Sequence, residues 1–202
     1  MDVSPIGFDV GETHEALIRL RKAGFTPADL HRIAESDEIA QKMVEALRGG
    51  AYPVTVDYSK TIEEMVAAGG YNYANPDITT KNFPPKGKGI VEVQIQLVHF
   101  NRVMSSDAVL EELDKMGLKP VMPMEISALG AKYPDLQRQF PIAGLGQVWQ
   151  VPNGNRNVLC LESDDRKRNL NLNWLENDWN ENWRFAAVRK FFFILPLRAE
   201  VF

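Results

Sequence analysis

The chain has 202 residues, of which 45% are hydrophobic and 25% are charged, and its formal net charge is -4. This balance is typical of a globular protein with one main domain and excludes long disordered stretches. The acidic total disfavours nucleic acid and anionic membranes as global partners, because phosphate binding normally requires a basic excess.

The cysteine content and the start of the chain bear on location. Cys160 is the only cysteine, so neither an intrachain disulfide nor a thiolate zinc cluster can form. The first residues carry acids where a signal peptide needs a basic region, and no segment approaches the roughly eighteen apolar residues of a membrane span. We expect a cytoplasmic protein with no membrane segment, no bound metal and no cofactor.

Residues 1–50 predict a short helical N-terminal segment. Apolar residues recur at helical spacing over 12–22. The run Thr26-Pro27-Ala28-Asp29 then provides an N-cap, a proline in the first turn and an acid that suits the helix dipole. Another turn begins at Ser36, and an apolar stripe continues to Leu47, before a diglycine that marks the boundary of the main domain. Two or three short helices are therefore expected.

The next stretch predicts strands and helices in alternation. A short strand is expected at 54–57, and a capping box at 61–64 begins a helix that runs to 68. The clearest strand covers 90–101, where apolar residues and His99 alternate with polar ones, so that one face is buried and the other is wet. Helices should follow from 106 to 116 and from 123 to about 133.

The last third contains four alternating runs, at 142–151, 158–162, 170–175 and 183–188, separated by residues that favour turns. They predict a four-stranded antiparallel meander. The expected fold is therefore a single α+β domain over 51–190 that ends in this meander. The apolar tail at 191–202 would then pack on the domain, add a strand, or bury itself against a partner chain as part of a homo-oligomer.

Five stretches between about residues 50 and 190 are distinctive: AGGYNYANPDITTKNFP (68–84), VEVQIQLVHFNR (91–102), ELDKMGLKP (112–120), LGAKYPDLQRQFPIAGLG (129–146) and WRFAAVRK (183–190). In these stretches the chain resembles a family of uncharacterised proteins from environmental bacteria, including candidate phyla with small genomes. The family has no established activity, cofactor or catalytic residue, so the resemblance implies no functional residue in this chain.

The segment 71–89 is long, irregular and rich in aromatic and amide side chains. Loops of this length inside a compact domain are usually functional or are wrapped onto the domain by their own aromatics. In the first case the ligand-binding candidates are Tyr71, Asn72, Tyr73, Asn75, Asp77 and Asn82. In the second case the aromatics pin the loop and nothing is bound.

The run NLNLNW at 169–174 is a second candidate. Strand alternation places Asn169, Asn171 and Asn173 on one face and Trp174 on the other, although asparagine is disfavoured in strands. A carbohydrate-like or peptide ligand could stack on an indole and bond to the amides. The alternative is a polar surface that prevents edge-to-edge pairing of strands.

The remaining candidates support other function classes. His99 could act as a base at the rim of the sheet, although a hydrogen-bonded core histidine is commoner. An enzyme would use His99 or a carboxylate, with the 71–89 loop as a lid over a small polar substrate. Basic residues that could contact nucleic acid are Lys81, Lys86, Lys88, Arg166, Lys167 and Arg168. Because no catalytic motif is assembled, we favour a non-catalytic binding or interaction module over an enzyme or a nucleic-acid-binding protein.

Overall fold

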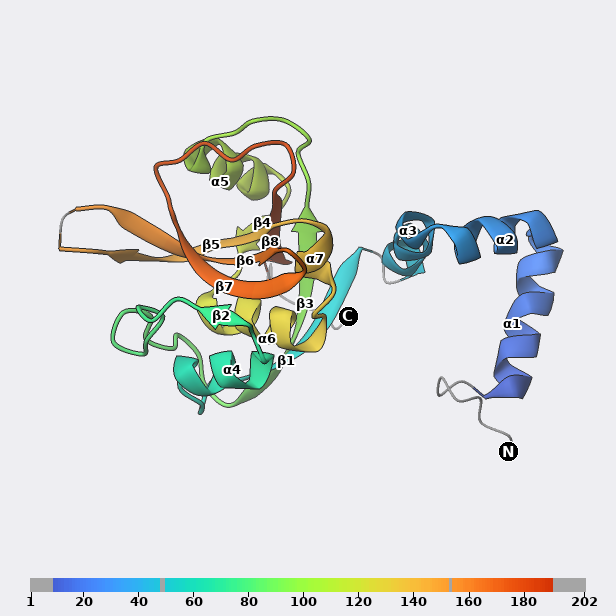
Figure 1. The fold of residues 1–202 in the computed structure, drawn as a ribbon, viewed down its shortest axis with the longest axis horizontal. Helices are drawn as coiled ribbons and strands as arrows, with labels where there is room; N and C mark the ends of the chain where they lie inside the picture. The colour runs from blue at the N-terminus through green and yellow to red at the C-terminus, as the bar shows by residue number, and fades with distance from the viewer. Residues whose placement is uncertain (1–8, 48–49, 153, 191–202) are drawn as a thin grey trace, which may run out of the picture. The chain divides into compact units, whose positions relative to one another are not determined.

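The computed structural model describes residues 9–47, 50–152 and 154–190. Contacts divide the chain into two units, Met1–Gly49 and Gly50–Phe202. The described residues form seven helices and eight strands (Figure 1).

The first unit contains α1 (Val10–Lys22), α2 (Pro27–Glu35) and α3 (Asp37–Leu47), so three helices form where two or three were predicted. The start of α2 is a capping box. The Thr26 hydroxyl accepts a hydrogen bond from the Asp29 N–H at 3.3 Å, and the Asp29 carboxylate accepts one from the Thr26 N–H at 2.9 Å. Two of the N–H groups that a helix start leaves unpaired are thereby satisfied.

The second unit is built on one mixed sheet with the strand order β1-β3-β8-β5-β6-β7-β2, and β4 pairs with β8. Its elements in chain order are β1 (Ala51–Asp57), α4 (Ile62–Gly69), β2 (Tyr73–Ala74), β3 (Ile90–Val98), α5 (Ser106–Lys115), β4 (Leu118–Pro120), α6 (Pro123–Lys132), α7 (Leu136–Gln139), β5 (Ile142–Gln150), β6 (Arg156–Asp164), β7 (Lys167–Trp174) and β8 (Arg184–Arg189). The predicted α+β class is confirmed.

The predicted four-stranded meander is wrong. The four runs do form strands, but only β5, β6 and β7 follow one another as antiparallel neighbours. β8 lies on the other side of β5, parallel to it, and is antiparallel to β3. The reason lies in the connection 175–183, which is too long for a hairpin loop and buries Leu175, Trp179 and Trp183 as it crosses one face of the sheet.

Both faces of the sheet are covered. Helices α4 and α6 lie on one face and α5 lies on the other (Figure 1). The alternation of β6 divides its side chains between the two cores: Leu159 and Leu161 face α4 and α6, and Val158 and Cys160 face α5. Since both layers are packed, the sheet is a rigid base for the segments at its margin.

Strand β5 bends away from β6 before the two strands form a projecting hairpin, on the left of Figure 1. The pairing register shifts between Gly144 and Trp149. In this interval the Gly146 N–H donates to the Val121 carbonyl at 3.0 Å, and a Cβ at Gly146 would lie only 2.4 Å from that oxygen. Glycine therefore permits this close approach, and the resulting bulge sets where the hairpin begins.

Candidate functional site

A pocket of about 480 Å³ lies where the β5–β6 hairpin, the end of β7 and the segment after β2 come together. We call it the tryptophan pocket. Its lining residues comprise two indoles, three carboxamides, one carboxylate and three apolar side chains: Trp149, Trp174, Asn75, Asn155, Asn157, Asp77, Val151, Pro152 and Leu172. The two predicted ligand-binding segments, 71–89 and 169–174, thus contribute to one cavity.

Three of these side chains form a row across adjacent strands. Trp149 of β5 pairs with Asn157 of β6, and Asn157 pairs with Trp174 of β7. Directly paired residues project from the same face of a sheet, and neighbouring strands lie about 4.8 Å apart. Asn157 therefore stands between the two indoles, and the strands that carry those indoles are about 10 Å apart.

Asn157 is the unusual member of this row. It is 6% exposed and lines the pocket. Within the described part of the chain, its side-chain amide has no hydrogen-bond partner among the protein groups. Among the described residues, Ser127 Oγ is the fully buried side-chain polar atom without a partner, so the Asn157 amide still reaches solvent through the pocket. The carboxamide thus presents a donor and an acceptor to whatever enters the pocket.

The two indoles differ in exposure. Trp174 is 53% exposed, which is high for the largest apolar side chain. Trp149 is half-buried, because its ring packs against Phe83 with the ring centres 6.2 Å apart at an angle of 65°. One indole is therefore held by the core of the protein, and the other offers its surface to solvent.

The wall opposite the hairpin is formed by Asn75 and Asp77, and it is held in place. The Asn75 N–H donates to the Leu170 carbonyl at 2.9 Å. The Asn75 side-chain oxygen accepts from the Asp77 N–H at 3.0 Å, and the Asn82 amide donates to the Asp77 carbonyl at 2.8 Å. Ile78 and Phe83 are buried beneath this segment. These contacts wrap the segment onto the domain, as in the second alternative, and the wrapping makes a fixed wall.

Arg168 anchors the beginning of the same segment. Its guanidinium donates to the carbonyls of Gly69 at 2.7 Å and Gly130 at 2.5 Å and to the Gln137 amide oxygen at 3.3 Å. It also lies 4.8 Å from the ring centre of Tyr71. Burial lowers the pKa of Arg168, but a guanidinium remains charged at any physiological pH. Arg168 is therefore a structural residue, contrary to its predicted role as a nucleic-acid contact.

Two of the predicted ligand-binding residues, Asn72 and Tyr71, contact Arg168. The Asn72 side-chain oxygen accepts from the Arg168 N–H, and the Asn72 N–H donates to the Arg168 carbonyl, both at 2.8 Å. The Tyr71 hydroxyl donates to the Ser127 carbonyl at 3.4 Å. Tyr73, in β2, is 48% exposed and does not line either described pocket.

The asparagine row on β7 protects a strand edge. Beyond its two-residue pairing with β2, β7 has no further strand neighbour on that side among the described residues. The Asn171 side-chain oxygen accepts from the Leu172 N–H at 2.9 Å, and the Asn173 oxygen accepts from the Trp174 N–H at 3.2 Å. These amides occupy donors that a foreign strand would use, which supports the predicted role against edge pairing.

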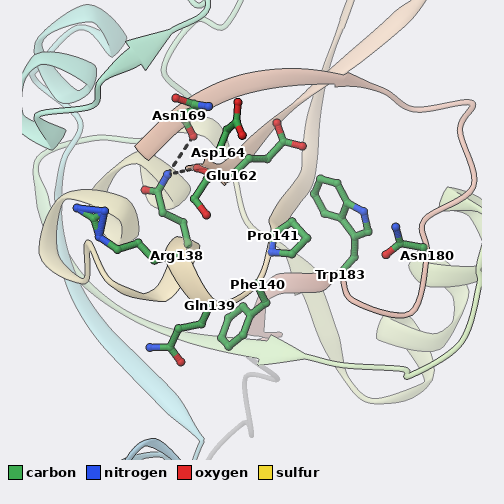
Figure 2. Close-up of a pocket in the computed structure, with 11 residues that line it drawn as sticks. Arg138, Gln139, Phe140, Pro141, Glu162, Asp164, Asn169, Asn180 and Trp183 are labelled. Carbon is green, nitrogen blue, oxygen red and sulfur yellow. Dashed lines mark hydrogen bonds between the residues drawn. The ribbon is translucent and has the colours of Figure 1, made fainter. Parts of the chain in front are cut away.

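A second pocket, of about 490 Å³, lies on the opposite face near α7 (Figure 2). The Gln137 amide spans it, donating to the Glu162 carbonyl at 2.6 Å and the Asn169 carbonyl at 3.0 Å. The Glu162 and Asp164 carboxylates line one side and Trp183 the other. The Glu162 carboxylate accepts from the Asn171 amide at 3.2 Å, so its hydrogen bonding is partly satisfied within the protein.

His99 does not take part in either pocket. The prediction placed it on the core-facing side of its strand, but β3 ends at Val98 and His99 is exposed. Its Nε2 lies 2.6 Å from the Glu181 carbonyl oxygen. The wet-face prediction for this strand also fails at its end, because Val98 is buried in the core under α5.

The predicted basic residues do not gather into one described pocket. Lys81, Lys86 and Lys88 are exposed on the loop, and Arg166 and Lys167 are exposed at the turn between β6 and β7. Asp164 and Asp165 stand in the same turn.

The titratable groups inside the fold do not provide an activated nucleophile. Burial, with the Glu162 carboxylate nearby, raises the pKa of the Cys160 thiol well above its ordinary value, so the thiol stays protonated. Burial and its hydrogen bond to Glu125 at 3.0 Å raise the pKa of Tyr58 as well.

In the described residues, no group of three or more His, Cys, Asp and Glu side chains could hold a metal, and no helix is both long and apolar enough to cross a membrane.

Sequence reasoning did not select Asn155 and Asn157 as site residues. The position of the hairpin turns was the sequence signal that could have found them, because a turn fixes which residues of its two strands stand opposite one another. The predicted interaction tail at 191–202 lies outside the described residues.

Comparison of the chain with protein-family models, with curated proteins and with solved structures finds no match.

Proposed function

We propose that the protein is a non-catalytic binding module of the cytoplasm and that its ligand occupies the tryptophan pocket. Asn157 carries this proposal. The residue is 6% exposed, and its amide lines the pocket between two indoles and has no hydrogen-bond partner among the described protein groups. Since no described protein group satisfies it, the carboxamide is available to a ligand that displaces the water of the pocket.

The lining of the pocket indicates a polar and uncharged ligand. Among the described lining residues, Asp77 alone is ionisable, and it stands at the exposed rim. A phosphorylated ligand would need a cation there, and a cationic ligand would gain more from a buried acid than from carboxamides. The indoles provide apolar surface, and the amides provide directional hydrogen bonds.

The two other function classes receive less support. The enzyme alternative named His99 or a carboxylate as the catalytic group. His99 lies outside both described pockets and contacts the Glu181 carbonyl. The nucleic-acid alternative is weakened because Arg168, one of its predicted contact residues, is buried. A cytoplasmic location is supported by the single cysteine, Cys160, which is buried as a free thiol and suits a reducing compartment.

The test uses NMR spectra of isotope-labelled protein, in which each indole N–H gives its own signal. Probes would be neutral oligosaccharides, neutral tripeptides and uridine at about 10 mM, enough to populate a site with a Kd near 1 mM. We expect at least one probe to shift the signals of Trp149 and Trp174. Trp179 is the internal reference, because its indole is 1% exposed and donates to the Ser106 hydroxyl at 2.8 Å.

The matched variants are Asn157→Leu, which removes the free amide, and Asn177→Leu, which changes an exposed asparagine outside the pocket. The first should abolish the shifts and the second should preserve them. If every probe leaves both pocket indoles unchanged in the wild-type protein, the proposed binding function is wrong.

A further inference from the structure

We infer that the ligand of the tryptophan pocket is a neutral oligosaccharide with at least two pyranose units. This inference rests on the proposed binding function and narrows it to one class of ligand. It depends on three features: the chemistry of the row Trp149, Asn157 and Trp174, the protected edge of β7, and the separation of the strands that carry the two indoles.

The row matches the two surfaces of a sugar ring. A pyranose has an apolar face of C–H groups and a rim of hydroxyl groups. The indoles of Trp149 and Trp174 are suited to the C–H faces, because the negative face of an aromatic ring attracts polarised C–H groups. The Asn157 amide, with both a donor and an acceptor free of protein partners, is suited to vicinal hydroxyls, each of which can donate and accept.

A peptide fits this site less well. An extended peptide gains most of its affinity by adding a strand to an open sheet edge. Here the edge donors nearest the pocket, the N–H groups of Leu172 and Trp174, are already bonded to asparagine side chains. A peptide would have to displace these bonds, whereas a saccharide has no need for backbone donors.

The dimensions of the row indicate more than one sugar unit. The strands that carry Trp149 and Trp174 are two spacings apart, about 10 Å, which exceeds the width of one pyranose ring. The pocket volume of about 480 Å³ lies within the range usual for small-ligand sites. One ring on each indole, with the hydroxyls near their linkage at Asn157, accounts for all three side chains.

The experiment is calorimetric titration of the full chain with cellotetraose, maltotetraose and chitotetraose, with the matching monosaccharides and with a neutral tripeptide and uridine. We expect one oligosaccharide to bind at least about tenfold more tightly than its monosaccharide, because only the longer ligand reaches both indoles. Trp174→Ala and Asn157→Leu should each weaken that binding about tenfold or more, and Asn177→Leu should leave it within about twofold.

Because Trp174 is exposed, its alanine variant should fold, and Trp174→Phe should retain measurable affinity through the remaining ring. Circular dichroism checks the fold of each variant. If the tripeptide or uridine binds and no saccharide does, the ligand class is wrong and the binding function stands. If no probe binds, both proposals fall. Equal affinity for monosaccharide and oligosaccharide, or unchanged binding in the Asn157 and Trp174 variants, would also overturn the inference.

Discussion

The buried guanidinium of Arg168 should be one of the strongest single determinants of stability in this protein. Arg168→Met retains an unbranched apolar stem and removes the charged group. Three acceptors then lose their donor: the carbonyl oxygens of Gly69 and Gly130 and the amide oxygen of Gln137. The guanidinium contact with the Tyr71 ring is lost as well.

The size of the effect follows from these contacts. An unpaired buried acceptor costs about 1–3 kcal/mol, and the lower end is appropriate because a methionine side chain is flexible enough to admit water. With about 0.5 kcal/mol for the ring contact, the free energy of unfolding should fall by roughly 3.5 kcal/mol. For a protein of this size, that corresponds to a decrease in Tm of roughly 7–14 °C.

Urea unfolding monitored by tryptophan fluorescence measures this loss, and Lys167→Met is the matched control. It removes the same charge from the neighbouring residue of β7, whose side chain is exposed, and should change stability by less than about 0.5 kcal/mol. If Arg168→Met and Lys167→Met unfold at the same urea concentration, the guanidinium does not hold the three acceptors and the assignment of Arg168 as a structural anchor is wrong.

Three other changes have defined outcomes. Ser106→Ala removes a buried hydroxyl that bonds to an indole N–H and a backbone carbonyl, and it should lower the free energy of unfolding in urea by roughly 2–3 kcal/mol. Asp165→Asn with Arg166→Gly should raise the free energy of unfolding by about 1 kcal/mol, because both residues have positive φ in a two-residue hairpin turn. An unchanged urea midpoint would contradict this expectation. Asn171→Val with Asn173→Val frees two edge donors and should produce concentration-dependent self-association in light scattering.

Local signals in the sequence predicted most elements of the fold. The capping box at Thr61 and the following glycines correctly bounded α4, whose carboxyl end is capped by Gly70 in the left-handed conformation. Alternation correctly identified all four strands of the last third. These signals succeed because each depends on contacts within a few residues of the chain.

The position of β8 could not be predicted in the same way. Alternation shows that a segment is a strand but does not show which strand it pairs with. The choice depends on the connection 175–183, where Trp179 and Trp183 pack on each other with ring centres 4.6 Å apart and hold the chain against the α5 face. If this connection is interpreted as a polar turn, the strand that follows it is expected to be the fourth strand of a meander.

The candidate site was predicted only in part, because it depends on register. Asn75, Asp77 and Trp174 were selected from composition, and all three line the tryptophan pocket. Aligning Asn157 with Trp174 requires the β6–β7 turn to be centred on Asp165 and Arg166. Turn-favouring residues between the runs 158–162 and 170–175 do not by themselves fix that centre, and a displacement of one residue sends every side chain to the other face.

The central place of β8 constrains how this protein can be made. A ribosome produces the other seven strands before it reaches residues 184–189, yet β8 belongs between β3 and β5. Until then the nascent sheet consists of two separate halves, each with an unpaired inner edge that another chain could join. Closure requires contacts between residues far apart in the sequence, and such topologies fold slowly. We therefore expect expression yield to depend on chaperones and on low growth temperature.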